Sequence, residues 1–153
     1  MRIVDFLHPE DIVPRLSAIT KGELLDELAG ALAKSHAGVD RAELLRVLQE
    51  RERLGSTGIG DGIAIPHGKM RRVDNILLAF GRSIAGIDFN ALDNRPVHLF
   101  FVLVAPEDAA GIHLKMLARI SRLLKDPAVR TGLLDAPDAA AIFAIIREQD
   151  CSH

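Results

Sequence analysis

The segment Gly55-Ser-Thr-Gly-Ile-Gly-Asp-Gly-Ile-Ala-Ile-Pro-His67-Gly-Lys69 is the part of the chain around which we expect the rest to fold. It is rich in glycine, which lacks a Cβ and lets backbone N–H groups approach a bound group. Three apolar residues interrupt the glycines, and Pro66 favours an extended conformation at Ile65. We therefore predict a short strand at Gly62–Ile65 that delivers His67 to its end, with glycine-loop amides crowding this imidazole. A nucleophile in that position is typical of group transfer.

Two helices are predicted before this segment. Thr20 and Glu23 have the spacing of a capping box, and leucines then recur at helical spacing to about His36, where Gly38 is a natural stop. A second helix begins near Asp40 and runs to Leu54, where Gly55 ends it. Upstream of both, Ile12-Val13 can form a short edge strand.

Arg51 lies in the last turn of the second predicted helix. It follows Leu44 and Leu48 on one helix face, which places its guanidinium along the body of the protein and close to the glycine loop. The alternative is that this cation only complements the negative end of the helix dipole. The spacing does not distinguish the two.

The second half of the chain alternates strands and helices. We predict a strand at Asn75–Phe80, then a turn and a small edge strand around Ile87 and Phe89 within Gly81–Asp93. Val97–Val104 is almost wholly apolar, as expected for a central strand covered on both faces. Helices are predicted after Pro106, from Asp126-Pro127, and from Asp135 and Pro137 onward. The pattern indicates one α/β domain over 1–153, a sandwich with a mixed sheet of about five strands and helices on both sides.

His113 falls in the first turn of the helix that follows the central strand. Counting 113, 117, 120 and 124 places it on the buried stripe. A helix N-terminus offers free N–H groups and partial positive charge, which favour anions such as phosphate and disfavour a protonated histidine. The alternative is a core histidine that bonds a backbone carbonyl.

Composition narrows the classes of function. The 153 residues suffice for one core, and a net charge of -2 gives no reason to expect nucleic-acid binding or membrane binding. No apolar run is long enough to cross a bilayer or to act as a signal peptide, so we expect a cytoplasmic protein. The single cysteine, Cys151, cannot form an internal disulfide and is expected to be a thiol at a frayed end.

Familiar glycine motifs and metal motifs are absent. A P-loop would need Gly at Ile63 and Ser or Thr at Met70, and the dinucleotide fingerprints need Gly or Ala at Ile63 or Ile65. Leu54 stands where a nucleophile elbow at Ser56 requires glycine. No two histidines have metal-ligand spacing and the only cysteine is near the C-terminus, so we predict no zinc site.

His67 is then the best candidate nucleophile. A neutral imidazole has a free lone pair near pH 7. If a nearby carbonyl accepts a hydrogen bond from Nδ1–H, Nε2 becomes the attacking atom. A phosphoryl group arriving there needs its oxygens neutralised, and glycine-loop amides, the helix terminus at His113 and Arg51 can together provide this.

Glu52 followed after six residues by Ile59-Gly-Asp-Gly-Ile-Ala-Ile-Pro-His67-Gly68 resembles the phosphorylation-site signature of the mannitol/fructose class of enzyme IIA domains of the bacterial phosphoenolpyruvate-dependent phosphotransferase system (PTS). The longer string from Arg51 to Lys69 is similar to the nitrogen-regulatory branch (IIA-Ntr), and the similarity extends over essentially the whole chain.

The resemblance implies an α/β sandwich in which His67 accepts the phosphoryl group on Nε2 to give tele-phosphohistidine. It implies that His113 is the second active-site histidine and that Arg51 stabilises the phosphate. The implied donor is a phosphohistidine on an HPr-type carrier, with no metal or cofactor. Asp61 stands where related sequences have Asn, which is expected to change loop hydrogen bonding or electrostatics but not the nucleophile.

The resemblance favours a phosphocarrier whose phosphorylation state signals to other proteins, because no membrane or IIB segment is fused to it. One alternative is a sugar-specific IIA component that passes phosphate to a IIB partner for mannitol or fructose uptake. The other is an interaction domain in which His67 is never phosphorylated.

Overall fold

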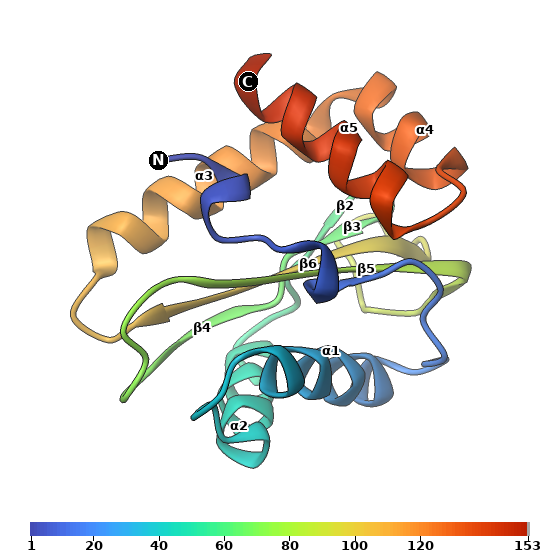
Figure 1. The fold of residues 1–153 in the computed structure, drawn as a ribbon. Helices are drawn as coiled ribbons and strands as arrows, with labels where there is room; N and C mark the ends of the chain where they lie inside the picture. The colour runs from blue at the N-terminus through green and yellow to red at the C-terminus, as the bar shows by residue number, and fades with distance from the viewer. Residues whose placement is uncertain (153) are drawn as a thin grey trace.

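The computed structural model describes the backbone of residues 1–152 and the side chains of residues 1–150. Within this range a six-stranded mixed sheet separates two helical layers (Figure 1). Helices α1 (Lys21–Ser35) and α2 (Arg41–Arg53) cover one face, and α3 (Ala110–Lys125), α4 (Pro127–Asp135) and α5 (Ala139–Ser152) cover the other. The predicted α/β class and helices on both sides are confirmed. The predicted thiol of Cys151 lies outside the described side chains.

The helix boundaries follow the capping residues found in the sequence. Thr20 accepts a hydrogen bond from the Glu23 amide at 3.2 Å, and Glu23 Oε1 accepts from the Thr20 amide at 3.2 Å, so the predicted capping box begins α1. Asp40 caps α2 by accepting from the amides of Ala42 and Glu43. Both helices are therefore confirmed, with α1 ending at Ser35 and α2 at Arg53.

β6 (Val97–Pro106) is the central strand, as predicted. On one side it pairs antiparallel with β5 (Leu77–Ile87), whose other neighbour is the parallel edge strand β1 (Ile12–Val13). On its other side β6 pairs in parallel with two short strands in succession, β3 (Ile63–Ala64) and then β4 (His67–Met70). β2 (Gly58–Gly60) pairs antiparallel with β3, and short 3₁₀ turns at Ile3–Asp5 (η1) and Pro9–Asp11 (η2) precede β1.

The turn predicted within Gly81–Asp93 is wrong, because β5 continues through it to Ile87. The two glycines that suggested a turn have other roles. A Cβ on Gly81 would lie 3.0 Å from the Leu16 side chain, so this glycine makes room for the N-terminal segment. Gly86 has a φ of +88° and lies where the pairing between β5 and β6 shifts register. Glycine inside a strand thus marks close packing and an irregularity here.

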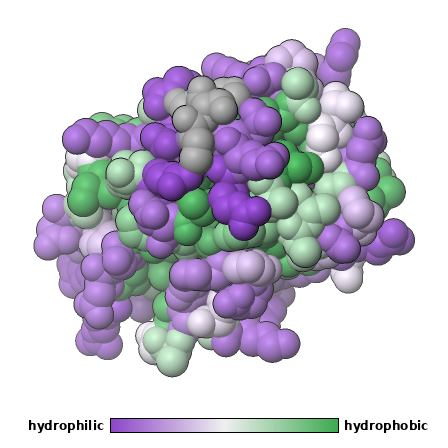
Figure 2. Space-filling model, turned by 45° about the horizontal axis from the view of Figure 1, so that its top comes forward, coloured by the Kyte–Doolittle hydropathy of each residue, from purple (hydrophilic) through white to green (hydrophobic). Residues whose placement is uncertain are grey.

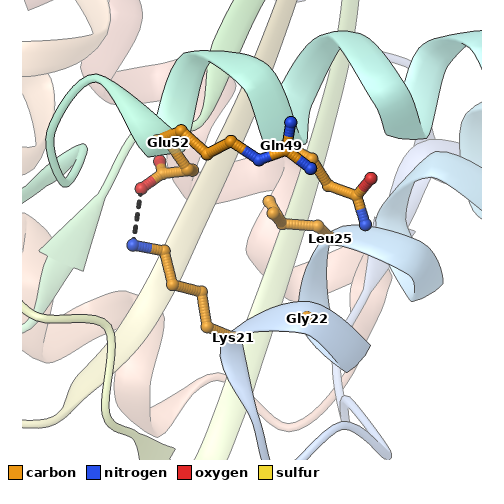
Figure 3. A pocket seen from close by; sticks show the side chains of 6 residues that line it. Lys21, Gly22, Leu25, Gln49 and Glu52 are labelled. Atoms are coloured by element: carbon orange, nitrogen blue, oxygen red, sulfur yellow. Dashed lines mark ion pairs between the residues drawn. The ribbon is translucent and has the colours of Figure 1, made fainter.

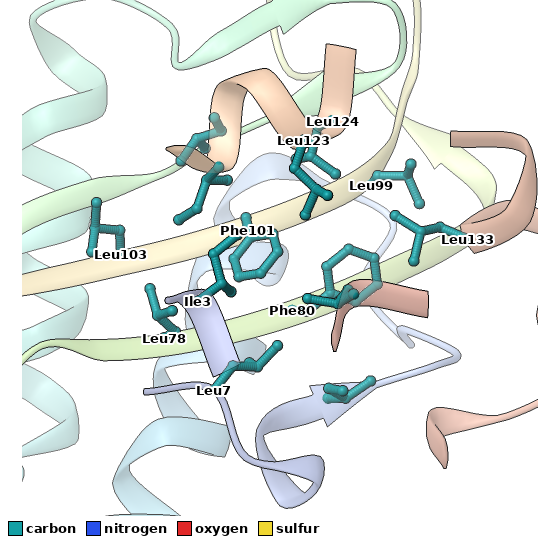
Figure 4. Packing of buried hydrophobic residues seen from close by; sticks show 14 of the residues in the cluster. Ile3, Leu7, Leu78, Phe80, Leu99, Phe101, Leu103, Leu123, Leu124 and Leu133 are labelled. Carbon is teal, nitrogen blue, oxygen red and sulfur yellow. The ribbon is translucent and has the colours of Figure 1, made fainter. Parts of the chain in front are cut away.

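Alternate residues of β6 enter two separate cores. Phe101 and its neighbours on one face pack with η1 and helices α3 to α5. Figure 4 shows Phe101 close to Ile3 of η1 and to Leu123 of α3. Phe100 and its neighbours on the other face pack with α1 and α2. Because both faces are covered, the strand reads as a continuous apolar run in the sequence.

No helix among residues 1–152 is both long enough and apolar enough to span a bilayer. Polar residues cover much of the face shown in Figure 2, with apolar residues between them.

Candidate active site

Three element ends meet around a surface hollow of about 650 Å³. The C-terminal end of α2 contributes Arg51, the beginning of β4 contributes His67 and Lys69, and the first turn of α3 contributes His113. The other lining residues are Arg46, Val47, Glu50, Leu54, Gly68 and Glu107. The fold therefore brings together all three residues that the sequence singled out.

The His67 ring is held by the backbone. Its Nδ1 lies 2.7 Å from the carbonyl oxygen of Ile65. A carbonyl can only accept, so Nδ1 carries the proton and the Nε2 lone pair is left free. Ile65 lies just beyond the paired residues of β2 and β3. Its amide donates to Thr57 O at 3.1 Å, one residue before β2 begins at Gly58. The Nδ1–H form of His67 is the tautomer that we predicted for attack by Nε2.

The position of His67 differs in one respect from the prediction. We expected one strand over Gly62–Ile65 ending at the histidine, whereas β3 stops at Ala64 and His67 begins β4. Pro66 has no N–H to donate and interrupts the ladder, although its carbonyl still accepts from the Leu103 amide at 3.0 Å. The chain then resumes pairing with the same strand, β6.

Burial, a hydrogen bond and two nearby charges change the pKa of His67. Partial burial lowers this pKa most, because desolvation disfavours the charged ring, and the Arg51 charge lowers it further. The hydrogen bond to Ile65 and the Glu52 charge act in the opposite direction. The net shift is downward, so the ring is neutral, and its lone pair available, to a lower pH than for a free histidine.

His113 faces His67 edge-on. The two ring centroids lie 5.4 Å apart, with the ring planes at 85°. His113 is buried, and desolvation, with the nearby His67 and Lys69, lowers its pKa to about 4. Its Nδ1 is buried and has no hydrogen-bond partner among the described residues, so the alternative of a core histidine satisfied by a carbonyl does not describe that nitrogen. No side chain caps the N-terminus of α3 beside it.

Close contact between α2 and β4 positions Arg51. A Cβ on Gly68 would lie only 2.5 Å from Val47 Cγ1, so the helix rests directly on the strand. One turn after Val47, Arg51 donates from Nη1 to the Gly55 carbonyl at 2.8 Å. The guanidinium is thus fixed across the end of α2 beside His67, which agrees with the packing alternative inferred from its spacing.

The prediction that the glycine loop crowds His67 is wrong for most of its glycines. Of the five, only Gly68 lines the hollow. Ile63 pairs with Leu99 and His67 with Leu103, so Gly62 lies roughly 13 Å or more from His67 along β6. Gly62 instead approaches His98, and its φ of +77° serves the turn between β2 and β3. The extended Ile63–Pro66 segment carries the loop away from the imidazole.

Glu52 organises the chain between α2 and β2. This buried carboxylate accepts from the Thr57 amide at 3.2 Å and from the Thr57 hydroxyl. Its charge is paired with Lys21 Nζ at 2.8 Å, and Figure 3 shows this pair spanning a second hollow between α1 and α2. Lys21 Nζ also lies 4.6 Å from the centre of the Phe89 ring. The pair joins the first turn of α1 to the last turn of α2, which carries Arg51.

The family model described as phosphoenolpyruvate-dependent sugar phosphotransferase system, EIIA 2, matches residues 5–149. The chain belongs to this family. It is 43% identical to a nitrogen regulatory protein of Bradyrhizobium diazoefficiens over 95% of both chains. It is 39% identical to the fructose-specific EIIABC component of Bacillus subtilis over 98% of this chain but 24% of that protein.

Among solved structures, this EIIA chain matches the nitrogen regulatory protein IIA-Ntr of Neisseria meningitidis with a TM-score of 0.89 and 33% identity. The match covers 94% of this chain and 98% of that one. Membership of the PTS IIA family, the resemblance to the nitrogen-regulatory branch and the α/β fold are therefore confirmed.

Sequence reasoning missed several residues in or near the candidate site. Lys69 and Leu54 line the hollow but received no role, and Glu52 was noted only as the start of the signature. The signal for Glu52 was available, because it follows Leu44 and Leu48 at intervals of four residues on the buried face of α2, and a buried carboxylate needs a cation. Lys21 could not be linked to it because the contact depends on how α1 and α2 pack. Asp61 lies outside this hollow, exposed with a φ of +58°, and its amide donates to Asp93 Oδ2 at 3.1 Å.

Proposed function

We propose that this protein is a phosphocarrier that accepts a phosphoryl group on Nε2 of His67 from an HPr-type carrier. The observation that carries the proposal is the 2.7 Å hydrogen bond from His67 Nδ1 to Ile65 O, which leaves Nε2 as the lone pair. That ring lies in an open hollow with Arg51, Lys69 and His113. The whole chain, residues 1–153, is then a single EIIA type-2 domain.

The transfer needs no cofactor. The Nε2 lone pair forms the N–P bond as the N–P bond to the donor imidazole breaks, and the donor ring leaves with that electron pair. Each ring keeps the proton on its other nitrogen, so no proton has to be exchanged. The step depends on alignment of donor, phosphorus and acceptor, and on neutralisation of the phosphoryl oxygens.

Arg51 and His113 are proposed to neutralise and position the phosphoryl oxygens. The guanidinium supplies a permanent positive charge and is already held in place by the Gly55 carbonyl. His113 has a pKa of about 4, so it is neutral at pH 7 and offers one N–H as a donor. The uncapped N-terminus of α3 adds backbone N–H groups nearby.

The surface around the hollow supports a protein donor. Leu54 lines the hollow and is 85% exposed, while Ile112 and Leu114 flank His113 and are 47% and 67% exposed. Exposed apolar side chains around a polar centre are suited to docking another protein. We propose that an HPr-type carrier docks here.

The regulatory role is supported by the extent of the similarity to the nitrogen regulatory protein, which reaches 95% of both chains. In this role the phosphorylation state of His67 changes binding to target proteins. The alternative is a IIA component for fructose or mannitol that passes phosphate to a IIB partner, supported by the 39% identity to the fructose-specific component.

The test is to incubate the protein with phosphoenolpyruvate, enzyme I and the HPr-type carrier and to measure its mass and the stability of the product. We expect one added phosphoryl group that is labile in acid and stable in base, and His67→Ala should abolish it. His98→Gln is the matched control, because His98 Nδ1 also lies 2.9 Å from a carbonyl, that of Ser83, but outside the hollow. Absence of labelling in the wild-type protein would favour an interaction domain.

Three further measurements test the neighbouring residues and the regulatory role. We expect slower labelling of Arg51→Gln and of His113→Ala. Unchanged rates would show that these side chains contribute only to packing. Arg51→Gln should also raise the His67 pKa measured by NMR, because the Arg51 charge lowers it. Rapid transfer from phosphorylated protein to a fructose or mannitol IIB domain would support sugar uptake over regulation.

A further inference from the structure

The fold assembles a second cluster of ionisable side chains far from the active site. His8 precedes η2, Asp11 ends it, and His36 is the C-terminal cap of α1. One nitrogen of each ring and one carboxylate oxygen all lie within 4.8 Å of one another. Among the side chains of residues 1–150, this is the only group of three or more His, Cys, Asp or Glu arranged in this way.

Two distances within the cluster match those between ligands of a tetrahedral ion. His8 Nδ1 lies 3.3 Å and His36 Nε2 lies 3.4 Å from Asp11 Oδ2. With zinc–ligand bonds of about 2.0–2.2 Å, adjacent ligand atoms of a tetrahedron are separated by about 3.4 Å. A direct charged hydrogen bond would be shorter, roughly 2.7–2.9 Å. Both ring nitrogens therefore lie at ligand spacing from the same carboxylate oxygen, and all three atoms lie within 4.8 Å of one another.

Asp11 accepts hydrogen bonds from the Ser35 hydroxyl and from His8, but none of the three side chains of the cluster carries a permanent positive charge. His36 Nε2 is buried and makes no hydrogen bond. Asp11 is completely buried, and its only ion-pair partners among the described side chains are the two imidazoles, which supply a charge only when protonated. A buried carboxylate without a cation is costly. A bound metal ion would supply that charge and take the free lone pair.

The surroundings also fit a metal ligand set. Ser35 Oγ donates to Asp11 Oδ1, which orients the carboxylate and leaves Oδ2 toward the two rings. Such hydrogen bonds behind a ligand are a regular part of metal sites. The His8 side chain is 51% exposed, so the cluster is open to solvent on one side. An ion can enter there and keep water in a remaining position.

We propose that His8, Asp11 and His36 bind a divalent transition-metal ion, with zinc as the preferred ion. Two imidazoles and one carboxylate suit zinc, and three protein ligands leave a position for water. The sequence predicted no metal because no two histidines have ligand spacing, and the three ligands meet only because the end of α1 packs against η2.

The site has a structural role. It joins the segment before the edge strand β1, blue in Figure 1, to the C-terminal end of α1. The opposite end of α1 carries Lys21, which pairs with Glu52 near the active site. A helix of 15 residues is about 22 Å long, so the ion lies well away from His67. Zinc therefore stabilises the N-terminal segment without entering the phosphoryl transfer.

The test is calorimetric titration of Zn²⁺ into metal-free protein. The variants are compared in a background of His67→Gln, His113→Gln and Cys151→Ser, which removes other candidate ligands. We expect one zinc ion per chain, and at least tenfold weaker binding for His8→Gln and for His36→Gln. Equal affinity in these variants, or a dissociation constant above about 1 mM in the background protein, would overturn the proposal.

Two controls separate loss of a ligand from loss of folding. His98→Gln removes a histidine outside the cluster and should bind zinc as the background does. His8 is half-exposed, so His8→Gln should keep the circular dichroism spectrum of the wild type and, with the active-site histidines restored, its labelling rate. Zinc should raise the melting temperature of the background protein but not that of His8→Gln. An equal rise in both would place the ion elsewhere.

Discussion

Replacing Gly68 by alanine should destabilise the protein through a single clash. The added Cβ would lie 2.5 Å from Val47 Cγ1, about 1 Å or more inside normal carbon–carbon contact. Valine in a helix strongly prefers one rotamer, so the methyl group cannot turn away cheaply. Either α2 moves away from β4 or the strain remains.

The magnitude follows from two opposing effects. Overpacking of this kind costs about 1–3 kcal/mol. Alanine also reduces the conformational entropy of the unfolded chain, which stabilises the folded state by about 0.4–1 kcal/mol. Gly68 does not have a positive φ, so no backbone strain is added. We expect the free energy of unfolding to fall by about 1–2 kcal/mol, which lowers the urea midpoint by about 0.5–1 M.

Urea denaturation of four variants tests this reasoning. Gly22→Ala is the matched control, because a Cβ there meets nothing within 4 Å and helix propensity should slightly stabilise it. Val47→Ala combined with Gly68→Ala removes the clash, so the double variant should lose at least about 1 kcal/mol less than the sum of the single variants. Phosphoryl acceptance, slowed in Gly68→Ala because Arg51 is displaced, should recover in the double variant. Additive losses, or a Gly68→Ala protein as stable as the wild type, would refute the contact.

Three further predictions concern buried polar groups. The pKa of His113 is about 4 in the folded protein and about 6.5 in the unfolded chain, so between these pH values only the unfolded chain binds this proton. The free energy of unfolding should therefore fall as the pH decreases from about 6.5 to about 4. The fall should be smaller in His113→Gln. An equal pH dependence in that variant would contradict this. Glu52→Gln removes the charge that pairs with Lys21 and should lower the unfolding free energy by about 1–3 kcal/mol in urea, with a further decrease in the His67 pKa by NMR; an increase in that pKa would count against the assignment. Arg82 donates to the carbonyls of Pro14, Leu133 and Ala136, so Arg82→Met should cost about 2–4 kcal/mol by calorimetry, whereas exposed Arg95→Met should cost less than about 0.5.

The features that could be predicted from the sequence are those determined by neighbouring residues. Thr20 with Glu23, and Asp40 with the amides after it, located both N-terminal helices because capping is a local interaction. The apolar run of β6 identified the central strand, and the position of His113 in the first turn of α3 followed from counting. His67 was recognisable because its chemistry and its signature lie in one short segment.

The remaining features depend on distant segments. Gly81 appeared to mark a turn, but it accommodates Leu16. The glycine loop appeared to surround His67, but the parallel pairing of Ile63 with Leu99 directs it away. His8 and His36 meet only through the packing of α1 on η2, which no spacing rule within one segment could reveal.

The acceptor that fixes the His67 tautomer is a main-chain carbonyl, that of Ile65. No side-chain substitution at position 65 can delete this atom, so the orientation of the ring tolerates mutation there as long as the backbone keeps its course. A peptide oxygen also carries only a partial charge, whereas an aspartate in its place would repel the phosphoryl dianion in the transfer that we propose. The backbone therefore orients the imidazole without placing a full negative charge beside the proposed phosphoryl group.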